Sequence, residues 1–186
     1  MRKINLLTDA LPDSITVFGK VYPVHTSFRN WVRIALLAGN GEKPSSKKTA
    51  EMLSLCYKEE LPPNLISALL GLERFLNRGA DFSAPVGNSA PLFSFAEDSE
   101  RIYAAFYKSY GIDLAKEDLH WYTFCALFSS LPEENPFATV LKIRSMDEKE
   151  ITDKEAKRKI RKLKNAFALK GEGREIDVAE EICALF

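Results

Sequence analysis

The sequence lacks the cysteine patterns that hold metal ions or form redox centres. Its three cysteines are odd in number and far apart, and no pair has the spacing of zinc ligands. Each lies among apolar neighbours, which is typical of a small buried side chain. We therefore predict that Cys56, Cys125 and Cys183 bind no metal ion and that the protein works in a reducing compartment.

Long hydrophobic runs are also missing. No apolar stretch approaches the roughly 20 residues that a helix needs to cross a bilayer. The basic N-terminus is interrupted by Asn5 and Asp9, so it lacks the continuous apolar centre of a signal peptide. We expect a cytosolic protein with no membrane partner.

Charge of either sign is not in excess, because 26 Lys and Arg residues balance 26 Asp and Glu residues. The overall balance therefore favours no class of partner, and only a local cluster of charge could do so.

Titratable groups that could form a catalytic site are scarce. There are only two histidines, His25 and His120, and neither belongs to a motif that pairs a histidine with an acid. The two Gly-x-Gly spacings follow predicted helices and do not continue into a phosphate-binding pattern. We predict no catalytic residues, no cofactor and no enzymatic activity, and interpret both histidines as structural.

Helical periodicity dominates what is present. Apolar residues recur at intervals of three and four positions in seven stretches between residues 28 and 167. The stretch from Leu119 to Leu131 is apolar nearly all round, which favours a central helix surrounded by others. The pattern predicts a mainly α protein, a compact domain of six or seven helices.

A small β-hairpin is predicted ahead of these helices. Two β-prone runs within residues 15–25 flank Gly19-Lys20, a pattern typical of a tight turn. Pro23 cannot donate a hydrogen bond to a neighbouring strand, so its strand should lie at an edge.

The chain length of 186 residues suits one domain with an attachment. Two prolines and a glycine without helical periodicity predict a flexible loop at about residues 80–93. We assign residues 1–170 to a single helical domain. Residues 171–186 form a C-terminal extension, in which Val178, Ile182 and Leu185 have the spacing of one further short helix.

Cations cluster near the C-terminus. Residues 154–170 carry eight Lys or Arg residues and one acid, Glu155, a local charge of +7. Three readings stay open: a solvated face, a surface that docks an acidic protein, and a surface that binds phosphate backbones, which we rank last because aromatic residues are few there. The candidate partner-binding cations are Lys157, Arg158, Arg161, Lys162 and Lys164.

Aromatic residues form the other candidate surface. Trp121 and Tyr122 follow several tyrosines, and together they are too many for one helix seam. Most should be buried, but any that is exposed is a good anchor for a partner, because Trp and Tyr dominate interface energetics. We therefore add Trp121 and Tyr122 to the candidate partner-binding residues.

Three strings of residues give the chain a resemblance to a known family. They are residues 110–114 (Tyr-Gly-Ile-Asp-Leu), residues 120–131 beginning His-Trp-Tyr, and residues 142–147 (Lys-Ile-Arg-Ser-Met-Asp). Together they resemble the bacteriophage gene-product-fifteen family of siphophages and prophages. Residues 11–14, residues 26–29 and the basic segment up to Leu169 are similar to it as well.

The resemblance implies a role in phage tail morphogenesis. It brings no catalytic residue, and by analogy the expected role is a tail assembly chaperone in the host bacterial cytoplasm, with the tape-measure or tail-tube protein as partner. A structural component of the virion is the alternative. A nucleic-acid-binding protein that uses residues 154–170 ranks third, and a homo-oligomer stays open.

Overall fold

The structure is a computed structural model that describes residues 4–39, 45–78, 91–148 and 151–170. The predicted loop at 80–93 lies mostly outside these residues, and the C-terminal extension 171–186 lies wholly outside them. Within the described residues the elements are β1 (Ser14–Val17), β2 (Lys20–Pro23), α1 (Phe28–Ala38), α2 (Ser46–Cys56), α3 (Leu65–Leu76), α4 (Ser99–Tyr110), α5 (Trp121–Ser129), α6 (Pro136–Ser145) and α7 (Lys154–Phe167). The prediction of a mainly α fold with an N-terminal hairpin is confirmed.

The hairpin is a two-stranded antiparallel sheet in which Val17 pairs with Lys20 and Ser14 with Pro23. Its turn lies at Phe18 and Gly19, one residue earlier than predicted, and both have positive φ angles, 50° and 80°. Two successive positive φ angles match the right-handed twist of the strands. Pro23 ends its strand, where the missing N–H costs no ladder hydrogen bond.

Helix starts follow the polar residues in the sequence. The side chains of Ser27, Ser45 and Asn64 each accept a hydrogen bond from a backbone N–H in the first turn of the helix that follows. Asn135 does the same for α6, with Pro136 at the first helical position as predicted. These caps satisfy N–H groups that have no partner within the helix.

The core is built around aromatic rings. Trp31 of α1 stacks on Phe75 of α3 with ring centroids 4.6 Å apart. Phe124 of α5 stacks on Phe28 of α1 and on Phe106 of α4, with centroids 4.9 Å apart in both pairs. The ring of Phe124 therefore joins the part of the chain before residue 79 to the part after residue 90.

The helix α5 is only partly surrounded. Its first turn is buried, but Cys125, Leu127 and Phe128 are half-exposed. The prediction of a helix covered on every side therefore holds only for the N-terminal half of α5, as far as the described residues cover it.

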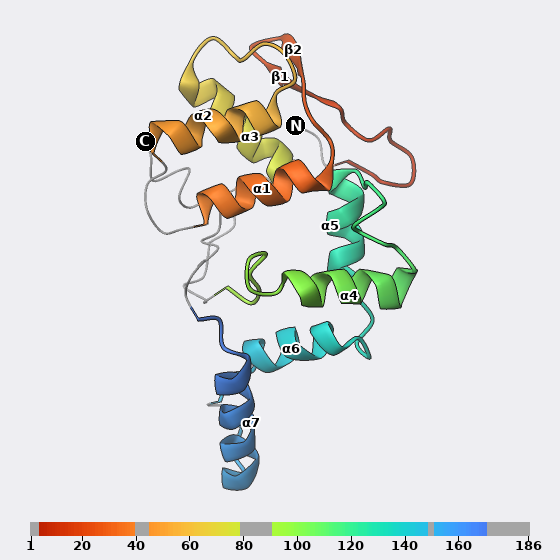
Figure 1. The fold of residues 1–186 in the computed structure, drawn as a ribbon, viewed down its shortest axis with the longest axis vertical. Helices are drawn as coiled ribbons and strands as arrows, with labels where there is room; N and C mark the ends of the chain where they lie inside the picture. Colours follow the sequence, from red (N-terminus) through yellow and green to blue (C-terminus); the bar gives the residue numbers. More distant parts are fainter. Residues whose placement is uncertain (1–3, 40–44, 79–90, 149–150, 171–186) are drawn as a thin grey trace.

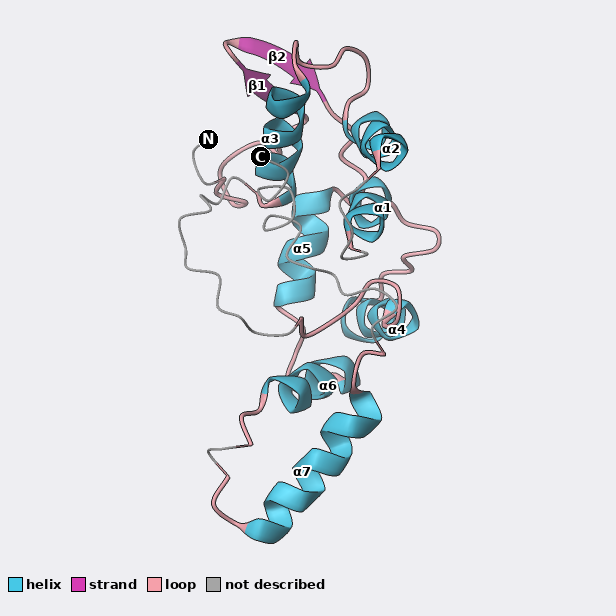
Figure 2. Ribbon diagram, turned by 90° about the vertical axis from the view of Figure 1, so that its left-hand side faces the viewer, coloured by secondary structure: helices cyan, strands magenta, loops and turns pink. Residues whose placement is uncertain are grey.

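The elements are arranged along one long axis (Figures 1 and 2). The hairpin, α2 and α3 lie at one end, α1 and α5 in the middle, and α4 and α6 beyond them. Helix α7 projects from α6 at the opposite end, with Lys154 at its far tip. Among the described residues, no helix combines the length and the apolar character needed to cross a membrane.

Candidate binding surfaces

Hydrogen bonds join the N-terminal end of α1 to the loop before α5. Arg29 donates hydrogen bonds to the Asp118 carboxylate at 2.9 Å and to the Leu114 carbonyl at 2.8 Å. The backbones join as well, because the N–H of Trp121 donates to the carbonyl of Thr26 at 2.7 Å. Two of the strings that carry the family resemblance, residues 26–29 and 120–131, therefore meet in space and hold the fold together.

His120 is a structural residue of this junction between α1 and the start of α5. Its Nε2 lies 2.9 Å from the Pro12 carbonyl oxygen, and its Nδ1 accepts the N–H of Tyr122 at 3.1 Å. A carbonyl only accepts, so the ring is neutral with its proton on Nε2. Burial lowers the pKa of His120 and outweighs the raising effects of the Pro12 carbonyl and Asp13.

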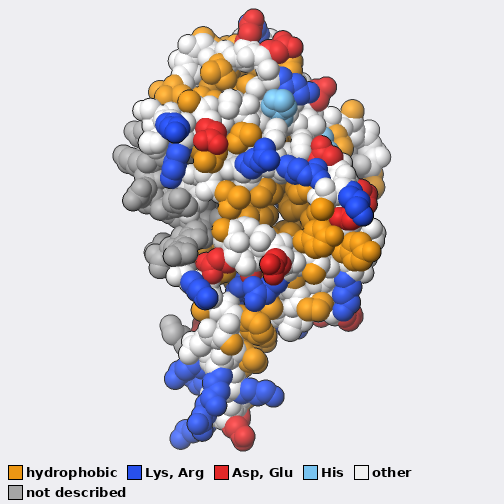
Figure 3. Space-filling view, viewed as in Figure 1, with side chains coloured by type: hydrophobic (Ala, Val, Ile, Leu, Met, Phe, Trp, Pro, Cys, Tyr) orange, Lys and Arg blue, Asp and Glu red, His pale blue; other side chains and the backbone are white. Residues whose placement is uncertain are grey.

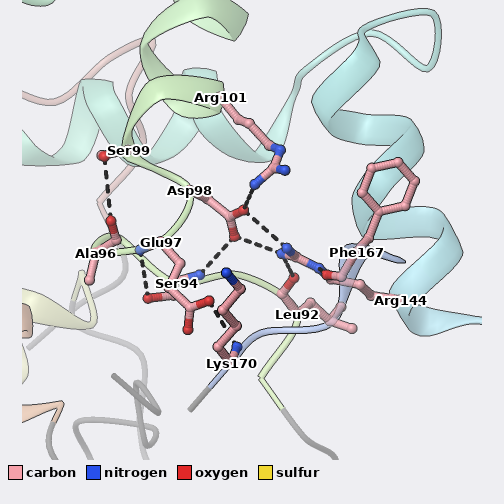
Figure 4. Close-up of polar contacts among 10 residues, drawn as sticks. All are labelled: Leu92, Ser94, Ala96, Glu97, Asp98, Ser99, Arg101, Arg144, Phe167 and Lys170. Atoms are coloured by element: carbon pink, nitrogen blue, oxygen red, sulfur yellow. Dashed lines mark hydrogen bonds and ion pairs between the residues drawn. The ribbon is translucent and has the colours of Figure 1, made fainter. Parts of the chain in front are cut away.

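A buried ion pair joins α4, α6 and α7 (Figure 4). Asp98 is fully buried, and its two carboxylate oxygens accept hydrogen bonds from Arg144 at 2.6 and 3.0 Å. Arg144 also donates to the carbonyls of Leu92 and Phe167, at 2.8 and 2.7 Å. One guanidinium therefore fixes the start of α4 and the end of α7 to α6.

The charge on Asp98 is well compensated. Burial by itself would raise its pKa, but hydrogen bonds from Arg144 and from the backbone of Ser94 outweigh burial, and the pKa of Asp98 is lowered. The half-exposed side chain of Arg101 donates a further hydrogen bond to the Asp98 carboxylate at 2.8 Å. Arg144 belongs to the third string of the resemblance, so this string too serves the fold.

The first candidate binding surface is a groove between α2 and α3. It has a volume of about 670 Å³. Two leucines at its rim are exposed, Leu61 at 50% and Leu65 at 55%, and Ile66 and Leu70 continue the apolar surface along α3. Half of the residues lining the groove are apolar or aromatic and half are polar: His25, Ser46, Thr49, Ala50, Leu53, Ser54, Tyr57, Lys58, Glu59, Leu61, Leu65 and Leu69.

The second surface is α7, which carries seven cations and one acid, a charge of +6. Lys and Arg side chains surround its projecting end (Figure 3). None of its residues is buried, and its apolar stripe of Ile160, Leu163 and Phe167 is only half-covered. Phe167 packs against the core cluster, whereas the stripe nearer the tip lies beyond it.

The predicted cations differ in their surroundings. Arg161 donates to the Glu148 carboxylate at 2.9 Å, and Lys164 donates to the Met146 carbonyl at 2.7 Å. Within the described part of the chain, Lys157, Arg158 and Lys162 form no ion pair. All five lie on the one projecting helix, so the structure keeps them together as the sequence predicted.

Trp121 and Tyr122 do not belong to a surface. Their exposed fractions are 5% and 1%, because α1, α3 and α4 pack around the first turn of α5. The Trp121 indole N–H donates to the Leu76 carbonyl at 2.9 Å, and burial raises the pKa of Tyr122 to about 12. We correct the expectation that these two side chains anchor a partner, since both are part of the core.

Two of the tyrosines that precede Trp121 in the sequence are at the surface, together with apolar residues of α3. Tyr103 and Tyr107 of α4 are 39% and 58% exposed, and their rings stack with centroids 6.4 Å apart. Leu65, Ile66 and Leu70 were assigned only to a helix stripe. The sequence does contain a signal for the exposure of Leu65 and Ile66. The segment that forms α3 is apolar on more than one helical face, so some of its apolar residues are left at the surface.

The described cysteines and histidines lie apart from one another in the chain and in their surroundings. No group of three or more His, Cys, Asp or Glu side chains that could hold a metal ion occurs among the described residues. Cys56 is buried and Cys125 half-buried, and burial raises the pKa of both thiols, that of Cys125 to about 12. His25 lines the groove, and its backbone carbonyl accepts a hydrogen bond from the indole N–H of Trp31 at 2.8 Å.

A family model described as bacteriophage Gp15 protein matches residues 7–169, a range that contains the seven described helices and the hairpin. Neither a curated protein nor a solved structure matches the chain.

Proposed function

This chain belongs to the bacteriophage Gp15 protein family, and from that premise we propose that it is a tail assembly chaperone. In this role it binds the tape-measure or tail-tube protein in the host bacterial cytoplasm until the tail polymerises, and it acts by binding alone, without catalysis.

The observation that carries this proposal is the apolar groove between α2 and α3. Two leucines at its rim leave half or more of their surface exposed to water. Covering this apolar surface with a partner would contribute about 25 cal/mol of binding free energy for each Å² buried. A groove of about 670 Å³ with an apolar rim suits the apolar face of an amphipathic helix. A chaperone for a long helical protein needs such a receptor.

The groove also has the right kind of polar boundary. Lys58 and Glu59 lie at its edge, and His25, Thr49 and Ser54 offer polar atoms beside the leucines. Polar groups at the rim orient a helix and contribute little affinity, whereas the apolar centre supplies most of it. The expected partner segment is therefore a helix with apolar residues at every third or fourth position.

The proposal is tested by co-expression with the adjacent tape-measure protein. The wild-type chain should keep that protein soluble and elute with it. Leu65→Asp should abolish the complex, because it places a charge in the apolar groove. Leu65 is the first residue of α3, where a negative charge is favourable to the helix, so loss of binding is not explained by loss of folding.

A matched control is available at Leu7, which is 93% exposed and outside the groove. Leu7→Asp should leave the complex intact. Unchanged solubility of the tape-measure protein with the wild-type chain, or equal binding by Leu65→Asp, contradicts the proposal. Finding this chain at stoichiometric amounts in purified virions by mass spectrometry would instead favour a structural tail component.

A nucleic-acid-binding role is the second candidate, favoured by the cations of α7. Phosphate binding would make the affinity for duplex DNA fall steeply between 50 and 200 mM salt. The triple substitution Arg158→Glu, Arg161→Glu and Lys162→Glu should then abolish DNA binding. Under the chaperone proposal, the same variant keeps its ability to solubilise the tape-measure protein.

A further inference from the structure

The half-covered stripe of α7 is an incomplete interface. An amphipathic helix in a globular protein is stable because its apolar face is buried, and helices of about 14 residues are marginal without such packing. In α7 the stripe runs through Ile160, Leu163 and Phe167, and no residue of the helix is buried. In the tip half of the stripe Ile160 and Leu163 are only partly covered, and Ala156 is exposed.

The chain that follows α7 has the complementary character. Residues 171–186 contain five acids and one arginine, a charge of −4, against +6 on α7. Val178, Ile182 and Leu185 are spaced at i, i+4 and i+7, so in a helix they share one face. On a helical wheel Glu175 and Glu181 flank this face on opposite sides, where they meet the cations that border the stripe of α7.

The geometry of the connection allows the two segments to meet. Lys170 is fixed at the body end of α7, where its backbone N–H donates to the Glu97 carboxylate at 2.8 Å. Gly171 and Gly173 follow and permit the chain to turn back, and residues 168–173 make a connection of ordinary length between two helices. Residues 174–186 as a helix would extend about 20 Å, and the 14 residues of α7 extend about 21 Å.

We propose that residues 174–186 dock as an antiparallel helix on α7 of the same chain, with Val178, Ile182 and Leu185 covering the Ile160–Leu163 stripe and the acids facing the cations of α7. The docked segment carries four acids and one arginine, which offsets half of the +6 charge of α7, and it occupies the surface that an acidic partner would otherwise use. The proposal concerns α7 and is independent of the groove between α2 and α3.

The antiparallel register makes a prediction that disulfide formation can test in the full-length protein. If residue 174 lies opposite Phe167, Leu185 lies opposite Ala156, and both belong to the faces that meet. In a Cys183→Ala background, Ala156→Cys together with Leu185→Cys should therefore form an intramolecular disulfide under mild oxidation. The matched control combines Leu185→Cys with Lys108→Cys, an exposed position on α4. Cys56 and Cys125 contribute little background because burial raises the pKa of both thiols.

We expect the disulfide to form at least about tenfold faster with Ala156→Cys than with Lys108→Cys, because docking raises the local concentration of one thiol near the other. Restoring Leu185 should abolish it. Adding Glu181→Lys should slow it, and combining this change with Lys159→Glu should restore the rate. Peptide mapping and gel mobility identify the bond.

Two outcomes overturn the proposal. Equal rates for the α7 and α4 thiols would mean that the acidic segment does not rest on α7. A disulfide that joins two chains, seen as a covalent dimer, would place the segment on a second copy instead. Neither result bears on binding of the tape-measure protein to the groove, so failure of this proposal is distinguishable from failure of the chaperone role.

Discussion

At the scale of single residues, Gly71 lowers the stability of its own helix but permits a close tertiary contact. Glycine in the middle of a helix destabilises it by about 1 kcal/mol relative to alanine. Here an added Cβ would overlap the hydroxyl of Tyr57 and lie 3.1 Å from Cγ2 of Ile15. The glycine lets α3 approach the hairpin and the end of α2 closely, while the Tyr57 hydroxyl donates to the Ala68 carbonyl at 2.8 Å.

We predict that Gly71→Ala lowers the free energy of unfolding by about 1–2 kcal/mol, since overpacking outweighs the gain in helix propensity. Urea denaturation followed by circular dichroism measures it. In a Tyr57→Phe background, which removes the hydroxyl, the cost of Gly71→Ala should shrink. An equal cost in both backgrounds would show that Tyr57 is not what the glycine accommodates.

His120 gives the protein a pH dependence at the same scale. Its folded-state pKa is lowered by burial, so the unfolded state binds the proton more readily. The stabilising effect of the neutral ring is therefore fully present above the unfolded pKa of about 6.5 and is lost as the pH falls through the folded pKa. Protonation also removes the acceptor for the Tyr122 N–H.

We expect the melting temperature to fall as the pH decreases below about 6.5. His120→Asn keeps an N-cap acceptor but cannot titrate, so it should flatten this part of the profile at some cost in stability at pH 7. His25→Asn is the matched control and should leave the slope unchanged. A profile of equal slope in His120→Asn and wild type would assign the pH dependence to other groups.

At the scale of elements, the position of α7 depends on one arginine. Arg144 is nearly buried, and it holds both Asp98 and the carbonyl at the end of α7. Removing one partner of a buried ion pair costs about 3–5 kcal/mol, because the other charge stays buried without compensation. The ion pair that the half-exposed Arg101 forms with Asp98 contributes much less to the stability of the fold.

Arg144→Met should therefore destabilise the protein by about 3–5 kcal/mol and increase hydrogen exchange in α7 before α4. Arg101→Met, the control on the exposed side, should cost about 1 kcal/mol or less. In an Asp98→Asn background the cost of Arg144→Met should decrease markedly. Similar costs for the two arginine substitutions would contradict a dominant role for the buried pair.

At the scale of the whole molecule, the aromatic rings make the front and back parts of the chain one folding unit. Phe124 is almost completely buried and stacks on Phe28 from α1 and Phe106 from α4. Truncation of such a ring leaves a cavity that the neighbouring helices cannot close fully. The two parts should therefore lose stability together.

Phe124→Ala should lower the free energy of unfolding by about 3–5 kcal/mol while keeping a single transition. Far-UV circular dichroism and tryptophan fluorescence measure this, because Trp31 lies in α1 and Trp121 in α5. The conservative Phe124→Leu should cost less. Two separate transitions in the alanine variant would show that the halves are independent domains.

Much of the fold could be predicted because its signals are local. Apolar spacing, caps such as Ser27 and Asn135, and the glycine of the hairpin turn each act within a few residues. The family resemblance likewise depended on short strings. The structure shows that these strings stabilise the fold, with Arg29 and Arg144 as their central contacts.

The sequence by itself determined the helices, the hairpin and the cationic face of α7, because each depends on neighbours along the chain. Only the tertiary structure decided that Trp121 and Tyr122 are core residues, that Leu61 and Leu65 face water beside a groove, and that Asp98 meets Arg144 across 46 residues. Burial is set by which other elements cover a residue. Packing between distant segments decides this, and no periodicity within one segment can specify it.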